Sequence, residues 1–189
     1  MINIAITGGI GSGKSAVLKI VQEFGYPVYS CDAIYKELLE DSIYIQKVEG
    51  LFPECVIKGR IDKALLAKFV FLSAENRKKI NELAHPLIME RLMRQMEQEC
   101  NLSFAEVPLL FEGGSEDLFD EIWVVMRDKN ARIESVIRRD NMSRSDALLR
   151  IAAQFDYDDA SEKMQMKNIK KIYNEGSIFV LKEKIKNLL

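Results

Sequence analysis

The 189-residue chain has few of the residues that build metal clusters and disulfide frameworks. It carries three cysteines, Cys31, Cys55 and Cys100, and a single histidine, His85. The cysteine count is odd and no C-x-x-C pair occurs, so neither a zinc site nor a thioredoxin-type centre is expected. Free thiols in a reducing cytosol are the simplest interpretation, and we expect a cytoplasmic protein.

Long apolar runs and an excess of one charge are also missing. No run approaches the roughly 20 apolar residues of a transmembrane helix, and no signal peptide is recognisable, so we expect no membrane association. The 27 basic and 29 acidic residues give a net charge of -2, which argues against a nucleic-acid binder. With 48% hydrophobic residues, the composition suits one compact soluble domain. We expect it to act on small molecules, as a monomer or weak homo-oligomer.

The chain opens with the pattern of a βαβ unit. Residues 2–7 form an apolar, β-branched run that predicts a buried strand. Residues 14–24 have the apolar spacing of a helix, which Gly25 and Pro27 end. Residues 28–30 read as a second strand, so the sheet is expected to be parallel.

Helical patterns dominate the rest of the chain. Strands are predicted at 102–107, 121–126 and 177–181, and a charged helical stretch at 128–173. Further helices are predicted at 32–40, 42–51, 62–71, 74–83 and 86–99, with a break at His85-Pro86. A helical insertion between strands is a candidate second lobe.

The segment Gly8-Gly9-Ile10-Gly11-Ser12-Gly13-Lys14-Ser15 matches the phosphate-loop pattern G-x-x-x-x-G-K-[ST] completely. Its glycines let the backbone approach phosphate closely, and the next helix directs its positive end at the same place. Lys14 supplies charge for the β- and γ-phosphates, and the Ser15 hydroxyl is a ligand for Mg²⁺. The loop identifies a nucleotide site without specifying the reaction.

Two carboxylates follow predicted strands and are candidates for chemistry. Asp32 could orient or deprotonate an attacking hydroxyl, because groups at strand carboxyl ends lie on the ligand side of a parallel sheet. It could equally be the N-cap of a helix that begins at Ala33. Glu106 could hold the Mg²⁺ shell through water, or could be a solvated strand end.

Three further features each allow two interpretations. His85 is the only histidine, and a lone histidine is more often structural than functional. The apolar run 108–111, which includes Leu110, is a core or pocket wall. The arginine-rich segment 127–150 is either a mobile lid over ATP or a solvated amphipathic helix. Within it, Ser143-Arg144-Ser145-Asp146 predicts a helix start at Ser143. Arg150 and Gln154 fall on one helix face there, four residues apart.

Together these segments resemble dephospho-CoA kinase. The matching segments are T-G-G-I-G-S-G-K-S at 7–15, the D-A-D-x-I region at 30–34, H-P at 85–86, P-L-L-F-E at 108–112, R-D at 139–140 and A-x-x-R-I-x-x-Q at 147–154. The resemblance implies an α/β P-loop NTPase-type three-layer fold with a five-stranded parallel sheet, a helical acceptor-binding insertion and a helical lid. The implied parts are a nucleotide-binding core at 1–32, 102–128 and 160–189, an acceptor lobe at 33–101 and a lid at 129–159.

The resemblance also implies the reaction and its residues. ATP, with Mg²⁺, would phosphorylate the ribose 3′-hydroxyl of dephospho-CoA to give CoA and ADP. Asp32, Lys14 and Arg139 would be catalytic, and Ser15 and Glu106 would bind the metal. Asp32, His85, Leu110 and Gln154 would contact the acceptor. Nucleotide contacts would come from Gly9, Gly11, Ser12, Gly13, Lys14, Ser15, Ala16, Arg150 and Asn174.

The chain departs from the family pattern at several positions. Ser30 replaces the first aspartate of D-A-D, and Ala16 replaces a threonine after the loop. Arg132 and Ser135 stand where the family commonly has glutamine and then arginine. The rival interpretations are another small-molecule P-loop kinase or a nucleotide-binding module without turnover.

Overall fold

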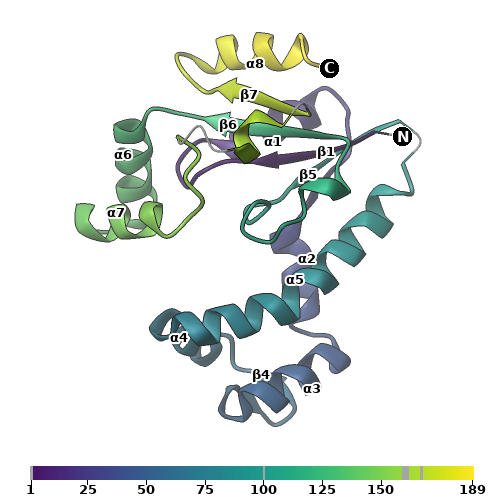
Figure 1. Ribbon diagram of the computed structural model, residues 1–189, viewed down its shortest axis with the longest axis vertical. Helices are drawn as coiled ribbons and strands as arrows, with labels where there is room; N and C mark the ends of the chain where they lie inside the picture. The colour runs from purple at the N-terminus through teal and green to yellow at the C-terminus, as the bar shows by residue number, and fades with distance from the viewer. Residues whose placement is uncertain (1, 100, 159–161, 167) are drawn as a thin grey trace. The chain divides into compact units, whose positions relative to one another are not determined.

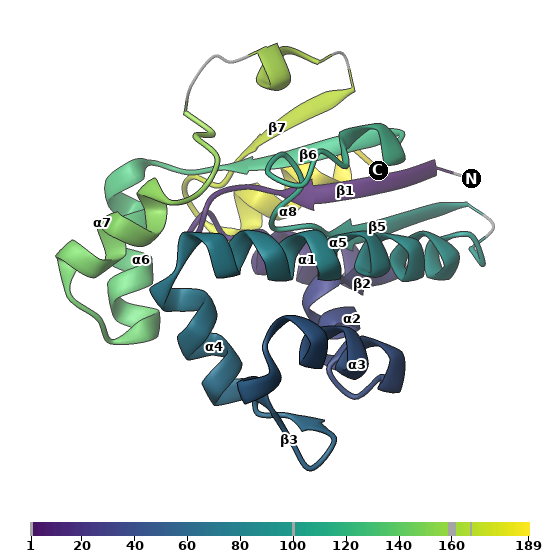
Figure 2. The same cartoon turned by 60° about the horizontal axis from the view of Figure 1, so that its bottom comes forward.

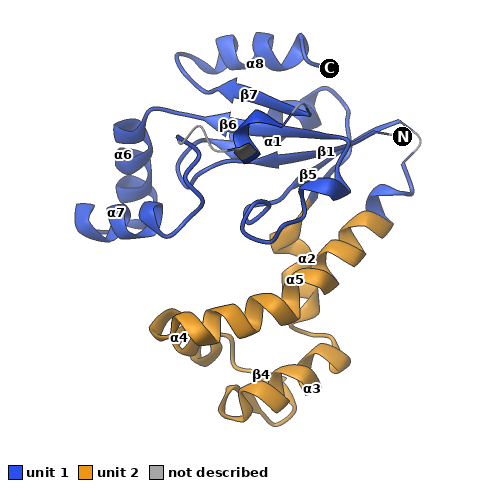
Figure 3. Cartoon of the chain, in the orientation of Figure 1, with its two compact units in different colours: residues 1–29, 95–189 blue, residues 30–94 orange. Residues whose placement is uncertain are grey.

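The computed structural model describes residues 2–99, 101–158, 162–166 and 168–189. Contacts between residues divide the chain into two compact units (Figure 3). The first unit consists of Met1–Tyr29 and Gln95–Leu189, and the second of Ser30–Arg94. Cys100, and the expected boundary between residues 159 and 160, lie outside the described residues.

The first unit is built on a five-stranded parallel sheet with helices on both sides, which confirms the predicted fold class (Figure 1). The strand order is β2-β5-β1-β6-β7. The strands are β1 (Ile2–Thr7), β2 (Val28–Ser30), β5 (Leu102–Glu106), β6 (Glu121–Met126) and β7 (Ile169–Tyr173). Because β1 lies at the centre, the loop that follows it emerges at the middle of the carboxyl edge.

Helices α1 (Lys14–Glu23) and α8 (Ile178–Lys186) pack against each other and against strands of the sheet. The core between them contains Phe104 and Trp123, whose rings meet edge to face with centroids 5.1 Å apart. Helices α6 (Lys129–Asp140) and α7 (Arg144–Ala152) form a hairpin at the carboxyl edge of the sheet (Figure 2). A small cluster of Ile133, Val136 and Ala147 holds this hairpin together.

Side-chain caps define where several helices begin. The carboxylate of Asp128 accepts a hydrogen bond from the backbone N–H of Ala131 at the start of α6, and the hydroxyl of Ser143 accepts one from Asp146 at the start of α7. Both residue types are favoured caps, and Ser143 is the start predicted from the sequence.

The second unit is mainly helical and has its own core. It contains α2 (Cys31–Leu38), α3 (Ser42–Leu51), α4 (Lys63–Leu72) and most of α5 (Ala74–Met96). Its buried cluster includes Leu38, Tyr44, Val48 and Ile80. A short antiparallel pair that the sequence did not predict, β3 (Val56–Ile57) and β4 (Arg60–Ile61), turns through Lys58 and Gly59 at positive φ.

Two predictions of secondary structure were wrong near the C-terminus. The run 177–181 is not a strand: Ser177 caps α8, and Leu181 and Ile185 are its buried residues, four apart. The fifth strand is β7, which lies inside the stretch predicted to be helical. Because β7 is an edge strand that carries two lysines, its sequence lacks the apolar signal of a buried strand.

The predicted break at His85-Pro86 was also wrong, because α5 runs through it with Pro86 inside the helix. A proline there removes one backbone hydrogen bond and crowds the preceding turn. Apolar residues on both sides of it, among them Ala84, Met89 and Leu92, are buried. Their burial offsets the local cost.

Tyr29 links the two points at which the chain leaves the first unit and returns to it. Its hydroxyl donates a 2.6 Å hydrogen bond to the carboxylate of Glu99, and burial, aided by that carboxylate, raises the pKa of Tyr29 to about 12. The last residue before the second unit is thus bonded to a residue just after it.

Candidate nucleotide and phosphotransfer site

The phosphate loop joins the central strand β1 to α1. Gly13 is the N-cap of α1 and adopts φ 96°, a left-handed conformation that glycine accepts without strain. No side chain caps the helix and its first turn contains no acidic residue. The backbone N–H groups and the positive end of the helix dipole are therefore directed at the loop, which suits an anion.

Lys14 folds back over the loop. Its ammonium donates to the carbonyl oxygens of Gly8, at 2.8 Å, and Gly9, at 3.4 Å. Ser15, the next residue, is exposed in the first turn of α1, whereas the side chain of Ala16 packs against the core. The charge expected of the motif therefore lies over the loop, and the residue that carries the expected hydroxyl is exposed in the first turn of the helix.

Asn174, which follows β7, anchors the far side of the loop. Its side-chain amide donates to the carbonyl oxygen of Ser12 at 2.8 Å and lies so close to Gly13 that a Cβ at that position would overlap it. Ser12 is buried, and its hydroxyl has no hydrogen-bond partner among the described residues.

The hairpin residues predicted for a lid fall into two groups. Arg139 donates two hydrogen bonds to Asp140, at 2.7 and 2.9 Å, and Arg150 donates one to the same carboxylate at 3.1 Å. The hydrogen bond from Arg139 is the main reason that the pKa of Asp140 lies below its usual value. Two arginines predicted from separate segments thus share one counter-ion.

The second group contacts the loop itself. Gln154 accepts a 2.6 Å hydrogen bond from the N–H of Ile10, and Arg132 donates a 3.2 Å hydrogen bond to the carbonyl of the same residue. Arg127 donates to the carbonyl of Gly11 and to the hydroxyl of Ser135. The sequence indicated Gln154, but showed Arg132 and Ser135 only as departures from a pattern.

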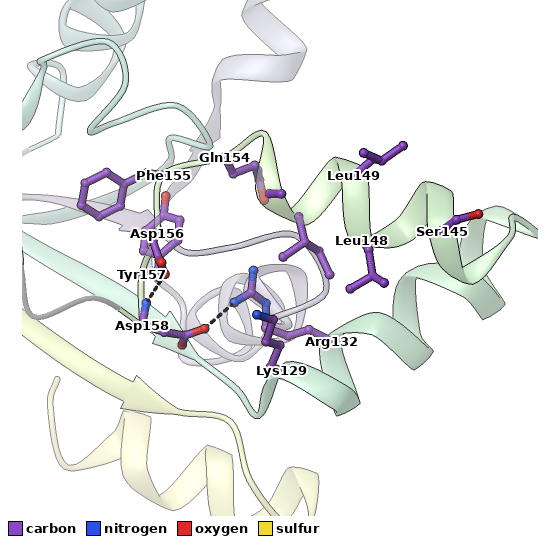
Figure 4. Close-up of a pocket in the computed structure, with 12 residues that line it drawn as sticks. Lys129, Arg132, Ser145, Leu148, Leu149, Gln154, Phe155, Asp156, Tyr157 and Asp158 are labelled. Atoms are coloured by element: carbon purple, nitrogen blue, oxygen red, sulfur yellow. Dashed lines mark hydrogen bonds and ion pairs between the residues drawn. The ribbon is translucent and has the colours of Figure 1, made fainter.

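A cavity of about 660 Å³ opens between the α6–α7 hairpin and the segment after it (Figure 4). Its lining includes Lys129, Arg132, Leu148, Gln154 and Asp158. It therefore reaches the two side chains that hold Ile10.

Tyr157, which the sequence did not indicate, belongs to this segment and is buried. Its hydroxyl is 3.0 Å from the hydroxyl of Thr7, the last residue of β1, and burial raises its pKa to about 12. Nearby, Glu112 accepts a hydrogen bond from the N–H of Phe155 at 2.8 Å. Glu112 ends the P-L-L-F-E match, so that motif ties the segment after the hairpin to the core.

Comparison with known proteins decides the family. The family model for dephospho-CoA kinase matches residues 2–178. The chain belongs to the dephospho-CoA kinase family. Dephospho-CoA kinase from Thermus thermophilus is 34% identical over 187 residues, which cover 98% of this chain and 89% of that protein. The enzyme from Carboxydothermus hydrogenoformans is 33% identical, with coverage of 98% and 92%.

Solved structures agree with the family assignment. A crystal structure from Thermus thermophilus superposes with a TM-score of 0.82 at 34% identity, covering 99% of this chain and 95% of that one. Shikimate kinase from Acinetobacter baumannii has a TM-score of 0.56 at 14% identity, covering 100% and 92%, and shares the fold. The predicted enzyme class is confirmed: the chain is a kinase of coenzyme A biosynthesis, and its family implies ATP as the phosphoryl donor.

The remaining predicted residues of this dephospho-CoA kinase family member lie in both units. In the first unit, Glu106 ends β5 in register with Ile6 on the neighbouring strand, about 4.8 Å away. Leu110 is fully buried.

Asp32 and His85 belong to the second unit. Helix α2 begins at Cys31 with Ser30 as its N-cap, so the N-cap alternative for Asp32 was wrong. Asp32 is exposed in the first turn. His85 is half-buried, burial lowers its pKa, and its Nε2 has no hydrogen-bond partner within the described part of the chain. The imidazole is therefore neutral at neutral pH.

The described ranges contain no group of three or more His, Cys, Asp or Glu side chains that could hold a metal ion. None of the helices there combines the length and apolar character needed to cross a membrane.

Proposed function

We propose that the chain transfers the γ-phosphoryl group of ATP to the ribose 3′-hydroxyl of dephospho-CoA, the last step of coenzyme A biosynthesis. The observation that carries the proposal is a complete phosphate loop in a member of this family, with Lys14 folded over it and no acidic side chain in the first turn of α1. Transfer is direct and in line, without a phospho-enzyme.

The loop residues bind the donor. Main-chain N–H groups of Gly11–Ser15 hydrogen-bond to the phosphates, and Lys14 places its charge on the β- and γ-oxygens. Gly9, Ser12 and Ala16 shape the loop by their backbone. Arg150 and Asn174 bind the nucleotide, and Arg139 stabilises charge on the transferring group once phosphate replaces Asp140 as its partner.

Ser15 and Glu106 are the residues that fit Mg²⁺. One is an exposed hydroxyl at the start of α1, and the other is a carboxylate at the carboxyl end of the strand beside β1. Mg²⁺ in such sites takes few protein ligands and is held largely by substrate phosphates and water. When bound, it would neutralise charge on the β- and γ-oxygens.

The helical second unit is proposed to bind the acceptor. Asp32 would orient or deprotonate the 3′-hydroxyl, since an exposed carboxylate can accept that proton. His85, neutral and with an unused ring nitrogen, can accept or donate one hydrogen bond to the acceptor. Gln154 and the wall formed by Leu110 complete this assignment. The parts are those predicted from the sequence: core, acceptor lobe and the lid at 129–159.

We place the enzyme in the cytoplasm, acting on small molecules rather than on nucleic acid, as a monomer or weak homo-oligomer. Cys31 and Cys55 are buried, which suits a reducing compartment.

The test is an assay of the purified protein with ATP, Mg²⁺ and dephospho-CoA, read by product mass. The expected product gains one phosphate on the ribose, and excess chelator should abolish turnover. A panel of other alcohol acceptors serves as the control. If the protein phosphorylated one of these alcohols but did not phosphorylate dephospho-CoA, the proposed acceptor would be rejected.

A further inference from the structure

Arg132 is a charged side chain buried beside the phosphate loop. Only 4% of it is exposed, although it carries a guanidinium that is costly to remove from water. It projects from α6 and lies against Gly9 so closely that a Cβ on that glycine would overlap the guanidinium.

Its partners among the described residues compensate this charge incompletely. A guanidinium has five N–H donors. The side chain of Arg132 donates to the carbonyl of Ile10, at 3.2 Å, and to the carboxylate of Asp158, at 3.5 Å. Within the part of the chain that the structure describes, Asp158 is the only charged partner; its side chain is 48% exposed and the contact is long (Figure 4). A single long contact with a half-exposed carboxylate compensates the buried charge weakly, so the guanidinium has capacity for another anion.

The position of Arg132 identifies that anion. The ammonium of Lys14 donates hydrogen bonds to the carbonyl oxygens of Gly8 and Gly9. In a phosphate loop, this lysine is the residue that reaches the β- and γ-phosphates. Arg132 contacts the loop at the same glycine, Gly9. Asn174, in contrast, contacts the loop at Ser12 and Gly13, where α1 begins. The guanidinium therefore lies toward the γ-phosphate end of the loop and lines the open cavity.

We propose that Arg132 binds the γ-phosphate of ATP and makes the loop distinguish ATP from ADP. This inference rests on the proposed ATP-dependent function. Arginine suits the task because its planar fork matches phosphate geometry and it is always charged. Binding would exchange the long contact with Asp158 for a charge-assisted hydrogen bond to phosphate, which is shorter and stronger.

The test compares two nucleotides on the same variants. Arg132→Gln removes the charge, and Arg138→Gln, an exposed arginine later in α6, is the charge-matched control. In calorimetric titrations with Mg²⁺ and a non-hydrolysable ATP analogue, Arg132→Gln should bind the analogue with an affinity roughly 10- to 100-fold lower than wild type. Affinity for ADP should stay within about threefold, because ADP lacks the γ-phosphate. The control should resemble wild type with both nucleotides.

Equal losses for the analogue and ADP would show that Arg132 only supports the loop, and would overturn the proposal, as would no loss for either. If Arg132→Gln does not fold, Arg132→Lys is used for the same comparison. Lysine keeps the charge but lacks the planar fork, so this variant should lose more affinity for the ATP analogue than for ADP. The titration needs no acceptor. A failed product-mass assay with normal nucleotide binding therefore rejects the acceptor alone.

Discussion

Gly8 offers a direct test of how the phosphate loop is seated on the sheet. It has φ 143°, and a Cβ added there would lie 2.5 Å from the backbone carbonyl oxygen of Val125 in β6. That oxygen belongs to a strand hydrogen-bonded on both sides and cannot move aside cheaply. Gly25, at the end of α1, also has positive φ, at 87°, but a Cβ there meets nothing within 4 Å.

The two alanine variants compare a glycine that has both a clash and a positive φ with one that has a positive φ alone. The backbone conformation should cost Gly25→Ala about 1–2 kcal/mol, and Gly8→Ala at least as much, because φ 143° lies beyond the left-handed helical region. Gly8→Ala should lose a further 1–3 kcal/mol, roughly, from overpacking. For a chain of this size each kcal/mol lowers Tm by about 2–4 °C. Thermal unfolding followed by circular dichroism should therefore place Gly8→Ala roughly 2–12 °C below Gly25→Ala. Equal melting temperatures would refute the described contact between the loop and β6.

Three further predictions concern single side chains. Tyr157→Phe leaves the buried Thr7 hydroxyl without its partner and should cost about 1–3 kcal/mol in urea unfolding. Because the folded pKa of Tyr157 is raised to about 12, its contribution is fully present below pH 10 and is lost as pH rises from 10 through 12; the variant should lose less stability over that range. Asp32→Asn should lower kcat by about 100-fold or more with little change in ATP affinity, and near-normal turnover would contradict its assignment as base. Lys14→Ala should weaken ATP binding roughly 10- to 100-fold and reduce kcat, whereas the exposed Lys19→Ala on the same helix should do neither.

The elements that the sequence predicted best were those with strong local signals. The first βαβ unit was correct because 2–7 is an apolar run and because the glycine-rich loop has a fixed relation to the strand before it and the helix after it. Ser143 was correctly identified as a helix start, since its hydroxyl caps α7 through a contact only three residues away.

The errors arose where long-range packing overrode local preference. The run 178–181 is rich in strand-forming residues, but most of it is exposed. Leu181 and Ile185, four residues apart, are the buried residues of α8, which packs against α1, and that spacing suits a helix. Strand β7 has two lysines because only one of its residues is buried at the edge of the sheet. Pro86 is tolerated within α5 because apolar residues on both sides of it are buried.

The candidate site shows the same division between local and distant information. The loop residues could be predicted because the motif is contiguous. The contacts of Arg132 and Tyr157 join positions more than a hundred residues apart, and nothing in their local sequence indicates them. A buried arginine reads the same as an exposed one in a charged helical stretch.

The hydrogen bond between Tyr29 and Glu99 has a consequence for how such enzymes diversify. It holds together the two points at which the chain departs from and returns to the nucleotide unit. An insertion whose ends are neighbours can be lengthened, shortened or exchanged without rerouting any strand of the host. With the acceptor assigned to the second unit, as we propose, a change of acceptor would require the replacement of one contiguous block of sequence and would leave the nucleotide unit unchanged.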